Sequence, residues 1–201
     1  ADVALVPAHD PPHKGPTRAD ALQRAEMLEL ALAGEPGLRV DRRELRRQGP
    51  SYTVDTLGEL RRELGADAPI AWLVGADSLL ELPTWHRWRE LFTLAHLVAV
   101  QRPGSEVDAA RLRAQAPEVL AEIDGRWLPP GDLAACPAGG FALLALPALR
   151  PESSTGLRRR IREGGDWQDW VAPAVAAFIV RHGLYRGPAD ILPASSHPSQ
   201  R

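Results

Sequence analysis

The sequence predicts an α/β fold with an open, mainly parallel sheet and helices on both faces. Apolar runs of strand length without a polar face occur three times, in the segments 70–74, 96–100 and 141–146. Such runs are typical of strands that are buried on both sides of a parallel sheet. Longer segments with apolar residues at helical spacing stand between them. This alternation predicts strands that are connected by helices.

Five strands are expected, near residues 1–6, 38–44, 70–75, 96–101 and 141–146. The main helices are expected at 18–33, 54–64, 109–123 and 172–182. Gly34 and Gly37 end the first helix, and Pro117 interrupts the third or splits it in two. Residues 1–186 therefore form the predicted domain, and the Pro- and Ser-rich segment 187–201 is predicted to be a disordered tail.

Composition restricts the class of protein. The chain has 201 residues, of which 44% are hydrophobic and 25% charged, and its formal net charge is −2. This balance gives no basic field for nucleic acid, and no apolar run reaches membrane-spanning length. The single cysteine, Cys136, excludes an intrachain disulfide and a cysteine-based zinc site. We therefore expect a soluble cytoplasmic protein with neither nucleic acid nor membrane as a partner. Whether it forms a homo-oligomer is left open by the sequence.

The segment 70–88, IAWLVGADSLLELPTWHRW, is the most informative part of the chain. Its strand stops at Gly75 and Asp77 follows, at the carboxyl edge where open α/β sheets bind ligands. A glycine there lets a ligand approach, and a carboxylate can accept both hydroxyls of a ribose; alternatively Asp77 only caps a turn. Trp85 and Trp88 would lie near one face of a following helix. Trp88 is expected in the core. For Trp85 two interpretations stay open: its ring packs in the core, or it stacks on a ring of a ligand.

Three further groups could bind anions. His13 and Lys14 follow the first strand and could hold a phosphate, or belong to a solvated loop. The segment 51–53, Ser-Tyr-Thr, precedes a helix, where it either caps the helix or leaves backbone N–H groups for a carboxylate or phosphate. The hydroxyl residues 153–155 and Arg158 could converge on a polyphosphate. The alternative is an ordinary N-cap followed by a solvated basic face.

Taken together, these motifs resemble the bacterial nicotinate-nucleotide adenylyltransferases. The resemblance rests on their order and spacing over residues 1–186. The motifs are V-P-A-x-x-P-P-H-K at Val6 to Lys14, R-x-x-M-L-E-L-A at Arg24 to Ala31, S-Y-T-V-D-T-L at Ser51 to Leu57, G-A-D-S-L at Gly75 to Leu79, P-T-W at Pro83 to Trp85, S-S-T-x-x-R at Ser153 to Arg158 and H-G-L-Y-R at His182 to Arg186. It implies a Rossmann-like nucleotidyltransferase fold. The implied reaction transfers an adenylyl group from ATP to nicotinate mononucleotide, giving nicotinate adenine dinucleotide and pyrophosphate in NAD biosynthesis.

The resemblance also implies roles for particular residues. The ATP phosphates would be held by Ser153, Ser154, Thr155 and Arg158, and the adenosine side by Gly75 and Asp77. His13 and Lys14 would lie at the phosphates, so that His13, Lys14 and Arg158 are the implied catalytic residues. Nicotinate would stack on Trp85, with its carboxylate held around Tyr52, Thr53 and His86, a position commonly occupied by tyrosine in relatives. Mg²⁺ is expected to accompany ATP, without a protein metal site.

Members of that family begin with a strand, a G-T-F-D-P loop and an H-x-G-H signature, which have no counterpart in residues 1–201. We therefore expect an N-terminally incomplete chain, with an open edge beside the strand at Val3. Two other functions stay open. One is another adenylyltransferase of the superfamily, of the pantetheine-phosphate type, although S-Y-T and P-T-W fit an aromatic carboxylate better. The other is a non-catalytic nucleotide-binding module.

Overall fold

The computed structural model describes residues 2–9, 19–102, 106–148 and 152–187. The chain divides into two compact units: unit 1 comprises residues 1–51 and 151–201, and unit 2 comprises residues 52–150. His13, Lys14 and the predicted tail beyond Gly187 lie outside the described residues. None of the helices in the described ranges combines the length and the hydropathy that a membrane crossing requires.

Unit 1 contains a two-stranded parallel sheet. β1 (Val3–Leu5) pairs with β2 (Leu38–Val40), and α1 (Ala21–Leu32) connects them. A capping box starts α1: the Asp20 carboxylate accepts from the Gln23 N–H, and the Gln23 side chain accepts from the Asp20 N–H. Among the described strands β1 is hydrogen-bonded only to β2, and no described strand pairs with its other edge.

The second predicted strand is shorter than expected. It was predicted over 38–44, but β2 ends at Val40 and a 3₁₀ helix, η1 (Arg43–Arg46), follows. The cause is Asp41, whose carboxylate accepts a hydrogen bond from the backbone N–H of Arg43 at 3.0 Å and from its guanidinium at 2.6 and 2.9 Å. A side chain that bonds the backbone two residues on competes with strand pairing.

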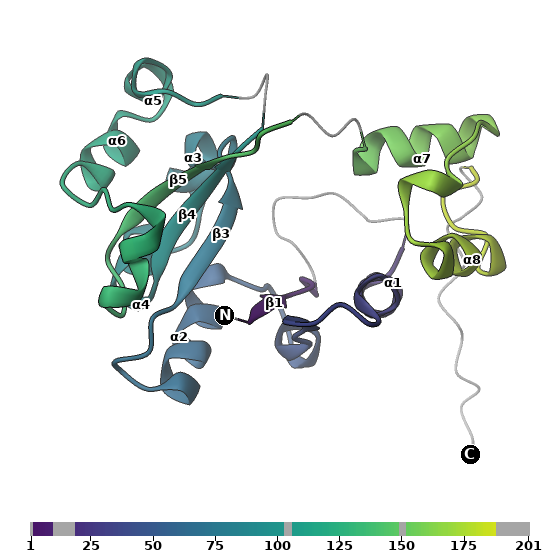
Figure 1. Cartoon of the computed structure of the whole chain (residues 1–201), viewed down its shortest axis with the longest axis horizontal. Helices are drawn as coiled ribbons and strands as arrows, with labels where there is room; N and C mark the ends of the chain where they lie inside the picture. The colour runs from purple at the N-terminus through teal and green to yellow at the C-terminus, as the bar shows by residue number, and fades with distance from the viewer. Residues whose placement is uncertain (1, 10–18, 103–105, 149–151, 188–201) are drawn as a thin grey trace. The chain divides into compact units, whose positions relative to one another are not determined.

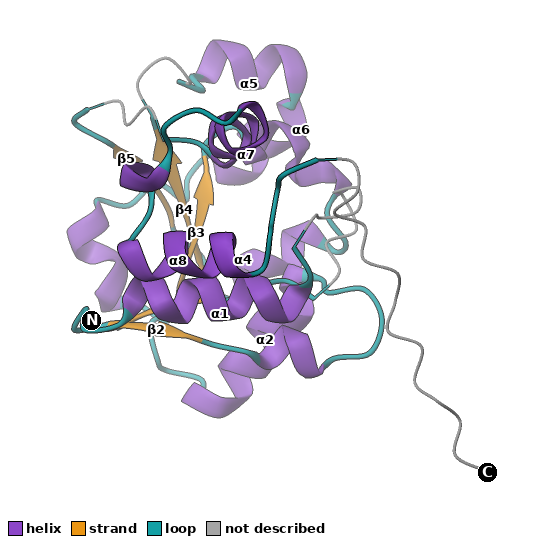
Figure 2. Ribbon diagram, turned by 90° about the vertical axis from the view of Figure 1, so that its right-hand side faces the viewer, coloured by secondary structure: helices purple, strands orange, loops and turns teal. Residues whose placement is uncertain are grey.

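Residues 152–187 of unit 1 are mainly helical. They contain α7 (Ser154–Glu163), η5 (Gln168–Trp170) and α8 (Pro173–Arg181). α8 lies beside α1, as Figure 2 shows. The two helices share one apolar core with residues near α7; its buried members are Ala19, Ile161, Trp167, Val175, Ala176, Phe178, Ile179 and Leu184.

Unit 2 contains a three-stranded parallel sheet, visible as adjacent strands in Figure 1. β3 (Ala71–Gly75) pairs with β4 (His96–Gln101), which pairs with β5 (Phe141–Ala145). The first four residues of β4 are all buried. Since successive strand residues point to opposite faces, both faces of β4 are covered. The parallel α/β fold predicted from the apolar runs is confirmed.

Short helices cover this sheet. They are α2 (Thr53–Leu64), α3 (Ser78–Glu81), η2 (Leu82–Thr84), η3 (Trp88–Glu90), α4 (Leu91–Leu94), α5 (Ala109–Gln115), α6 (Pro117–Ile123) and η4 (Pro130–Ala135). The predicted break at Pro117 is confirmed, because α5 ends before it and α6 begins with it. Leu57, Phe92, Val119 and Phe141, from four different elements, meet in one buried core.

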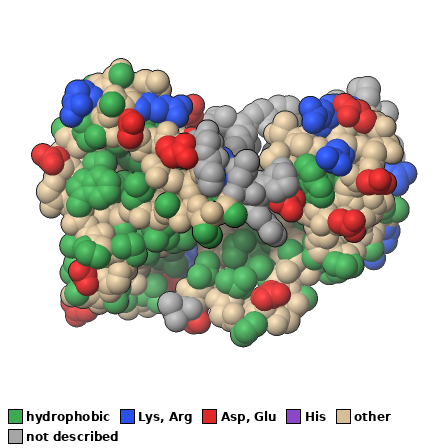
Figure 3. Space-filling model, turned by 45° about the horizontal axis from the view of Figure 1, so that its top comes forward, with side chains coloured by type: hydrophobic (Ala, Val, Ile, Leu, Met, Phe, Trp, Pro, Cys, Tyr) green, Lys and Arg blue, Asp and Glu red, His purple; other side chains and the backbone are tan. Residues whose placement is uncertain are grey.

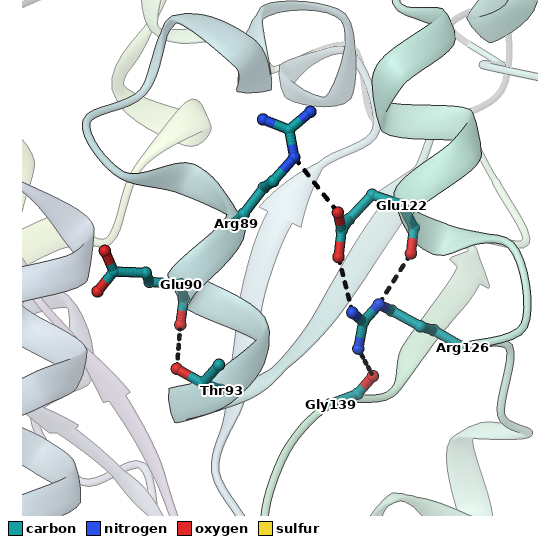
Figure 4. Close-up of polar contacts among 6 residues, drawn as sticks. All are labelled: Arg89, Glu90, Thr93, Glu122, Arg126 and Gly139. Carbon is teal, nitrogen blue, oxygen red and sulfur yellow. Dashed lines mark hydrogen bonds and ion pairs between the residues drawn. The ribbon is translucent and has the colours of Figure 1, made fainter.

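A polar network fastens the helices of unit 2 to the segment before β5 (Figure 4). The Glu122 carboxylate pairs with Arg126 at 2.7 Å and with Arg89 at 3.4 Å. The Arg126 guanidinium also donates to the Gly139 carbonyl at 3.3 Å. On the face drawn in Figure 3, basic and acidic side chains both occur.

Candidate functional site

The end of β3 presents a carboxylate. Gly75 is the last strand residue, and a Cβ at that position would lie 2.5 Å from Asp77 Oδ1. Asp77 is the N-cap residue of α3 but makes no side-chain capping bond. The capping alternative is therefore wrong for Asp77. Glycine at position 75 leaves room for the carboxylate over the strand end, where a ligand can reach it.

Arg102 is a residue of this edge that the sequence reasoning did not select. Its Nη2 lies 3.6 Å from Asp77 Oδ2, with the two side chains 54% and 60% exposed. Gly75 is paired with Val100 in the β3–β4 register. Asp77 follows Gly75 by two residues and Arg102 follows Val100 by two residues, so both lie at the same edge of the sheet. Parallel strands end at the same edge, and this rule could have identified Arg102. An exposed ion pair is weak, so a polar ligand can replace it.

The two tryptophans after β3 differ in exposure. Trp88 is buried in the core of unit 2, as predicted, whereas Trp85 is half-buried and only packs against that core. The single helix expected to carry both is absent. η2 ends at Thr84, and Arg87 takes a left-handed φ of 52° before η3 begins at Trp88. The turn at Arg87, rather than helical spacing, therefore sets the directions of the two rings.

Tyr52 and His86 come together although 33 residues separate them. Their ring centroids are 4.5 Å apart and the ring planes are inclined by 34°. Tyr52 is the N-cap residue of α2 and packs against the core, while His86 is exposed. Thr53 begins the helix, and Trp85 adjoins His86 in the chain. The structure thus brings Tyr52 against the segment that carries Trp85 and His86.

The capping role expected for a hydroxyl at the start of α2 is wrong. Tyr52, not a serine or threonine, occupies the N-cap position, and its side chain makes no capping bond. Ser51 precedes it, and among the described residues its buried Oγ has no hydrogen-bond partner. A helix start without a side-chain cap keeps N–H groups for an anionic group. This agrees with the other reading of Ser-Tyr-Thr, in which backbone N–H groups bind an anion.

The start of α7 is arranged differently. Ser153 is its N-cap residue, and its Oγ accepts a hydrogen bond from the Gly156 N–H at 3.1 Å. Arg158 Nη2 donates to Thr155 Oγ1 at 3.2 Å. Ser154 and Thr155 are exposed, in the first turn. Thr155 and Arg158 therefore converge as predicted, while Ser153 is engaged as the cap that the alternative predicted.

Two more groups of unit 1 contribute to the electrostatics near Arg158. Burial raises the pKa of the Tyr185 phenol, and the positive charges of Arg158 and Arg24 act in the opposite direction. Tyr185 takes a left-handed φ of 69° after α8. The Arg24 guanidinium donates to the backbone carbonyls of Ala19 and Ala8. Both residues lie in motifs of the resemblance, but the sequence indicates no role for either of them.

Across the described ranges, no three His, Cys, Asp or Glu side chains lie close enough together to hold a metal ion. The predicted site residues that are described are divided between the two units. Unit 2 holds Tyr52, Thr53, Gly75, Asp77, Trp85 and His86, and unit 1 holds Ser153, Ser154, Thr155 and Arg158.

Comparison with known proteins gives consistent results. A family model described as cytidylyltransferase-like matches residues 2–160. A probable nicotinate-nucleotide adenylyltransferase of Stenotrophomonas maltophilia is 49% identical over 192 residues, covering 92% of this chain and 84% of that protein. One of Laribacter hongkongensis is 48% identical over 187 residues, covering 92% and 81%.

Solved structures agree in fold. Plasmodium falciparum nicotinic acid mononucleotide adenylyltransferase complexed with NaAD matches with a TM-score of 0.64 at 15% identity, over 92% of this chain and 82% of that one. The same protein complexed with APC matches with a TM-score of 0.62, also at 15% identity and with the same coverage. At this identity the likeness concerns the fold alone.

Proposed function

The chain belongs to the nicotinate-nucleotide adenylyltransferase family, and from that membership we propose that it transfers the adenylyl group of ATP to nicotinate mononucleotide. The observation that supports this acceptor is the half-buried Trp85 next to the adjacent, mutually tilted rings of Tyr52 and His86 in unit 2. A planar pyridine ring can stack on a tryptophan face. Its carboxylate would take hydrogen bonds from His86, Thr53 and the uncapped start of α2.

Two groups of residues support the ATP side of the proposal. Arg158 and Thr155 would bind phosphate oxygens, because a guanidinium and a hydroxyl at a helix start donate to anions. Asp77 would accept the ribose hydroxyls, with Arg102 beside it. His13 and Lys14 keep the phosphate role that the resemblance implies.

The chemistry is an in-line displacement. An oxygen of the mononucleotide 5′-phosphate attacks the α-phosphorus of ATP and forms a new P–O bond. The bond to the bridging oxygen between the α- and β-phosphates breaks, and its electron pair leaves with pyrophosphate. Since the attacking oxygen is already anionic, no protein nucleophile or general base is needed. Catalysis then consists of positioning the two phosphates and stabilising charge, mainly by Arg158 among the described residues.

Mg²⁺ stays a proposed companion of ATP. The described residues offer no carboxylate cluster for it, so we propose that phosphate oxygens and water supply most of its ligands. A cytoplasmic location and a homo-oligomeric state also stay predictions.

The acceptor can be tested with the full-length gene product that contains residues 1–201. Pyrophosphate release would be measured with ATP and each of three acceptors: nicotinate mononucleotide, nicotinamide mononucleotide and phosphopantetheine. We expect the highest kcat/KM with the nicotinate form, because the acid receives charge-assisted hydrogen bonds and the amide only neutral ones.

A preference for nicotinamide mononucleotide would contradict the acid site but not adenylyl transfer. A preference for phosphopantetheine would support the other adenylyltransferase reading. Nucleotide binding without turnover of any acceptor would favour the non-catalytic module.

A further inference from the structure

The ring of Trp170 lies over the first turns of α7. Trp170 ends η5 and is half-buried, and it is not part of the apolar core of unit 1, unlike its neighbour Trp167. A Cβ at Gly156 would lie 3.1 Å from its Cζ3 atom and 3.5 Å from its Cη2 atom. The guanidinium carbon of Arg160 lies 4.3 Å from the ring centroid. Gly156 and Arg160 are four residues apart and therefore on one face of the helix.

The glycine at position 156 is explained by this contact. Gly156 lies inside α7 and is not among the glycines with positive φ, so the backbone conformation does not require glycine. Glycine is also one of the poorest helix formers. A Cβ would meet both Trp170 Cζ3 at 3.1 Å and Ser153 Oγ at 3.0 Å. Alanine would thus press on the indole and on the capping hydroxyl at once.

The segment before Trp170 is fastened to the same helix. Arg160 Nη1 donates to the Asp166 carbonyl at 3.0 Å, and the Gly165 N–H donates to the Arg160 carbonyl at 3.0 Å. A guanidinium over an indole adds cation–π attraction. The Trp170 ring therefore contacts α7 at two places. One is the Arg160 guanidinium, and the other is Gly156 in the first turn, next to the Ser153 cap.

We propose that Trp170 is a positioning residue for ATP. Its indole, in contact with the Cβ-free face of Gly156, fixes the first turn of α7 so that Thr155 and Arg158 meet the phosphates in one geometry. This rests on the proposed function, in which that turn binds ATP. Small displacements of phosphate-binding groups are costly, since catalysis here depends on position. Nicotinate mononucleotide would be bound mainly by residues of unit 2, so its binding should not depend on Trp170.

The test uses Trp170→Leu, Gly156→Ala and the double variant of the full-length gene product. Steady-state pyrophosphate release gives KM for both substrates, and calorimetry gives Kd for ATP without turnover. We expect each single variant to raise KM and Kd for ATP about fivefold to tenfold and to change KM for nicotinate mononucleotide less than twofold. In the Trp170→Leu background, Gly156→Ala should cause a smaller rise than it causes alone, because only its contact with the Ser153 hydroxyl remains.

Trp127→Leu, which alters an exposed tryptophan of unit 2, is the matched control and should leave ATP binding unchanged. Circular dichroism checks folding; if Trp170→Leu does not fold, Trp170→Phe serves in its place. Equal ATP affinity in folded variants, equal changes for both substrates, or additive effects in the double variant would overturn the proposal. A wild-type protein that binds ATP but does not use nicotinate mononucleotide would refute only the proposed acceptor, because the Kd measurements still test Trp170. A wild-type protein that binds no ATP would overturn both.

Discussion

The imidazole Nδ1 of His96 accepts a hydrogen bond from the backbone N–H of Gly140 at 2.9 Å. Its other nitrogen, Nε2, lies 2.8 Å from the Cys136 carbonyl oxygen. Because Nδ1 accepts, the proton of the neutral ring is assigned to Nε2, which donates to Cys136. A Cβ at Gly140 would lie 2.7 Å from Nδ1. His96 thus joins the start of β4 to both ends of the turn that leads into β5.

His96→Phe should destabilise the protein by about 2–4 kcal/mol, because a buried backbone N–H and a partly buried carbonyl lose their partner. Urea unfolding measures the difference. His86→Phe is the control, since His86 is exposed and its replacement should change stability by less than about 0.5 kcal/mol. Equal stability of the two variants would mean that water replaces both hydrogen bonds.

Asp41 predicts a sensitivity to acid. Burial alone would raise the pKa of its carboxyl, but hydrogen bonds from Arg43 and the charges of Arg43 and Arg39 outweigh burial and lower the pKa below its ordinary value of 3.8. A lowered pKa in the folded state means that the unfolded chain takes up the proton at higher pH. The stabilisation is therefore complete well above pH 3.8 and is lost as pH falls through that value and below it.

Urea midpoints between pH 6 and pH 3 would show this loss, and Asp41→Asn should flatten the acid side of the profile. Asp67→Asn, at an exposed position, is the control. An unchanged profile in the Asp41 variant would assign acid sensitivity to other carboxyls.

The sequence predicted the strands well because buried parallel strands have a strong local signature. The apolar runs 70–74, 96–100 and 141–146 cover nearly all of β3, β4 and β5. The end of β2 was missed because a single side chain, Asp41, redirects the backbone there. The route between the two tryptophans was missed for a similar reason, since the left-handed residue Arg87 carries no residue-type signal that marks such a turn.

The site was predicted where its residues are neighbours in the chain, such as Gly75 and Asp77. It was incomplete where partners come from distant segments. Arg102 reaches Asp77 only through the β3–β4 register, and Trp170 reaches Gly156 only through the packing of η5 on α7. Arg61 shows the general difficulty, because its guanidinium donates to carbonyl oxygens as distant in the chain as those of Leu94 and Pro137. Pairings of this kind have no local pattern.

Arg158→Ala should weaken ATP selectively. A charge-assisted hydrogen bond contributes about 1.5–3 kcal/mol, so KM for ATP should rise about tenfold or more. KM for nicotinate mononucleotide should stay within about twofold of the wild type by the same reasoning. Steady-state kinetics with each substrate varied in turn provides the measurement. Arg159→Ala, at the exposed neighbouring position, is the matched control. Similar kinetics for the two variants would mean that Arg158 belongs to a solvated basic face and does not bind ATP.

Trp85→Ala should have the opposite selectivity. An aromatic stack contributes about 0.5–1.5 kcal/mol beyond the area it covers, so affinity for nicotinate mononucleotide should fall about tenfold. Affinity for ATP should be nearly unchanged. Calorimetric titration of each substrate measures both. Trp127→Ala is the control for loss of an indole in unit 2. A Trp85 variant that binds the mononucleotide normally would mean that Trp85 only packs against the core and does not contact the ligand.

β3 also affects how this protein behaves in solution at high concentration. Among the described strands β3 is hydrogen-bonded only to β4, and Leu73 in its middle is 54% exposed. Edge strands without charged residues or proline are templates for pairing with another chain, and none of the residues from 70 to 76 is charged or a proline. Concentrated samples of the chain comprising residues 1–201 should therefore form intermolecular sheet and scatter light before they unfold. Leu73→Lys, which places a charge in the middle of this edge, should extend the usable concentration range.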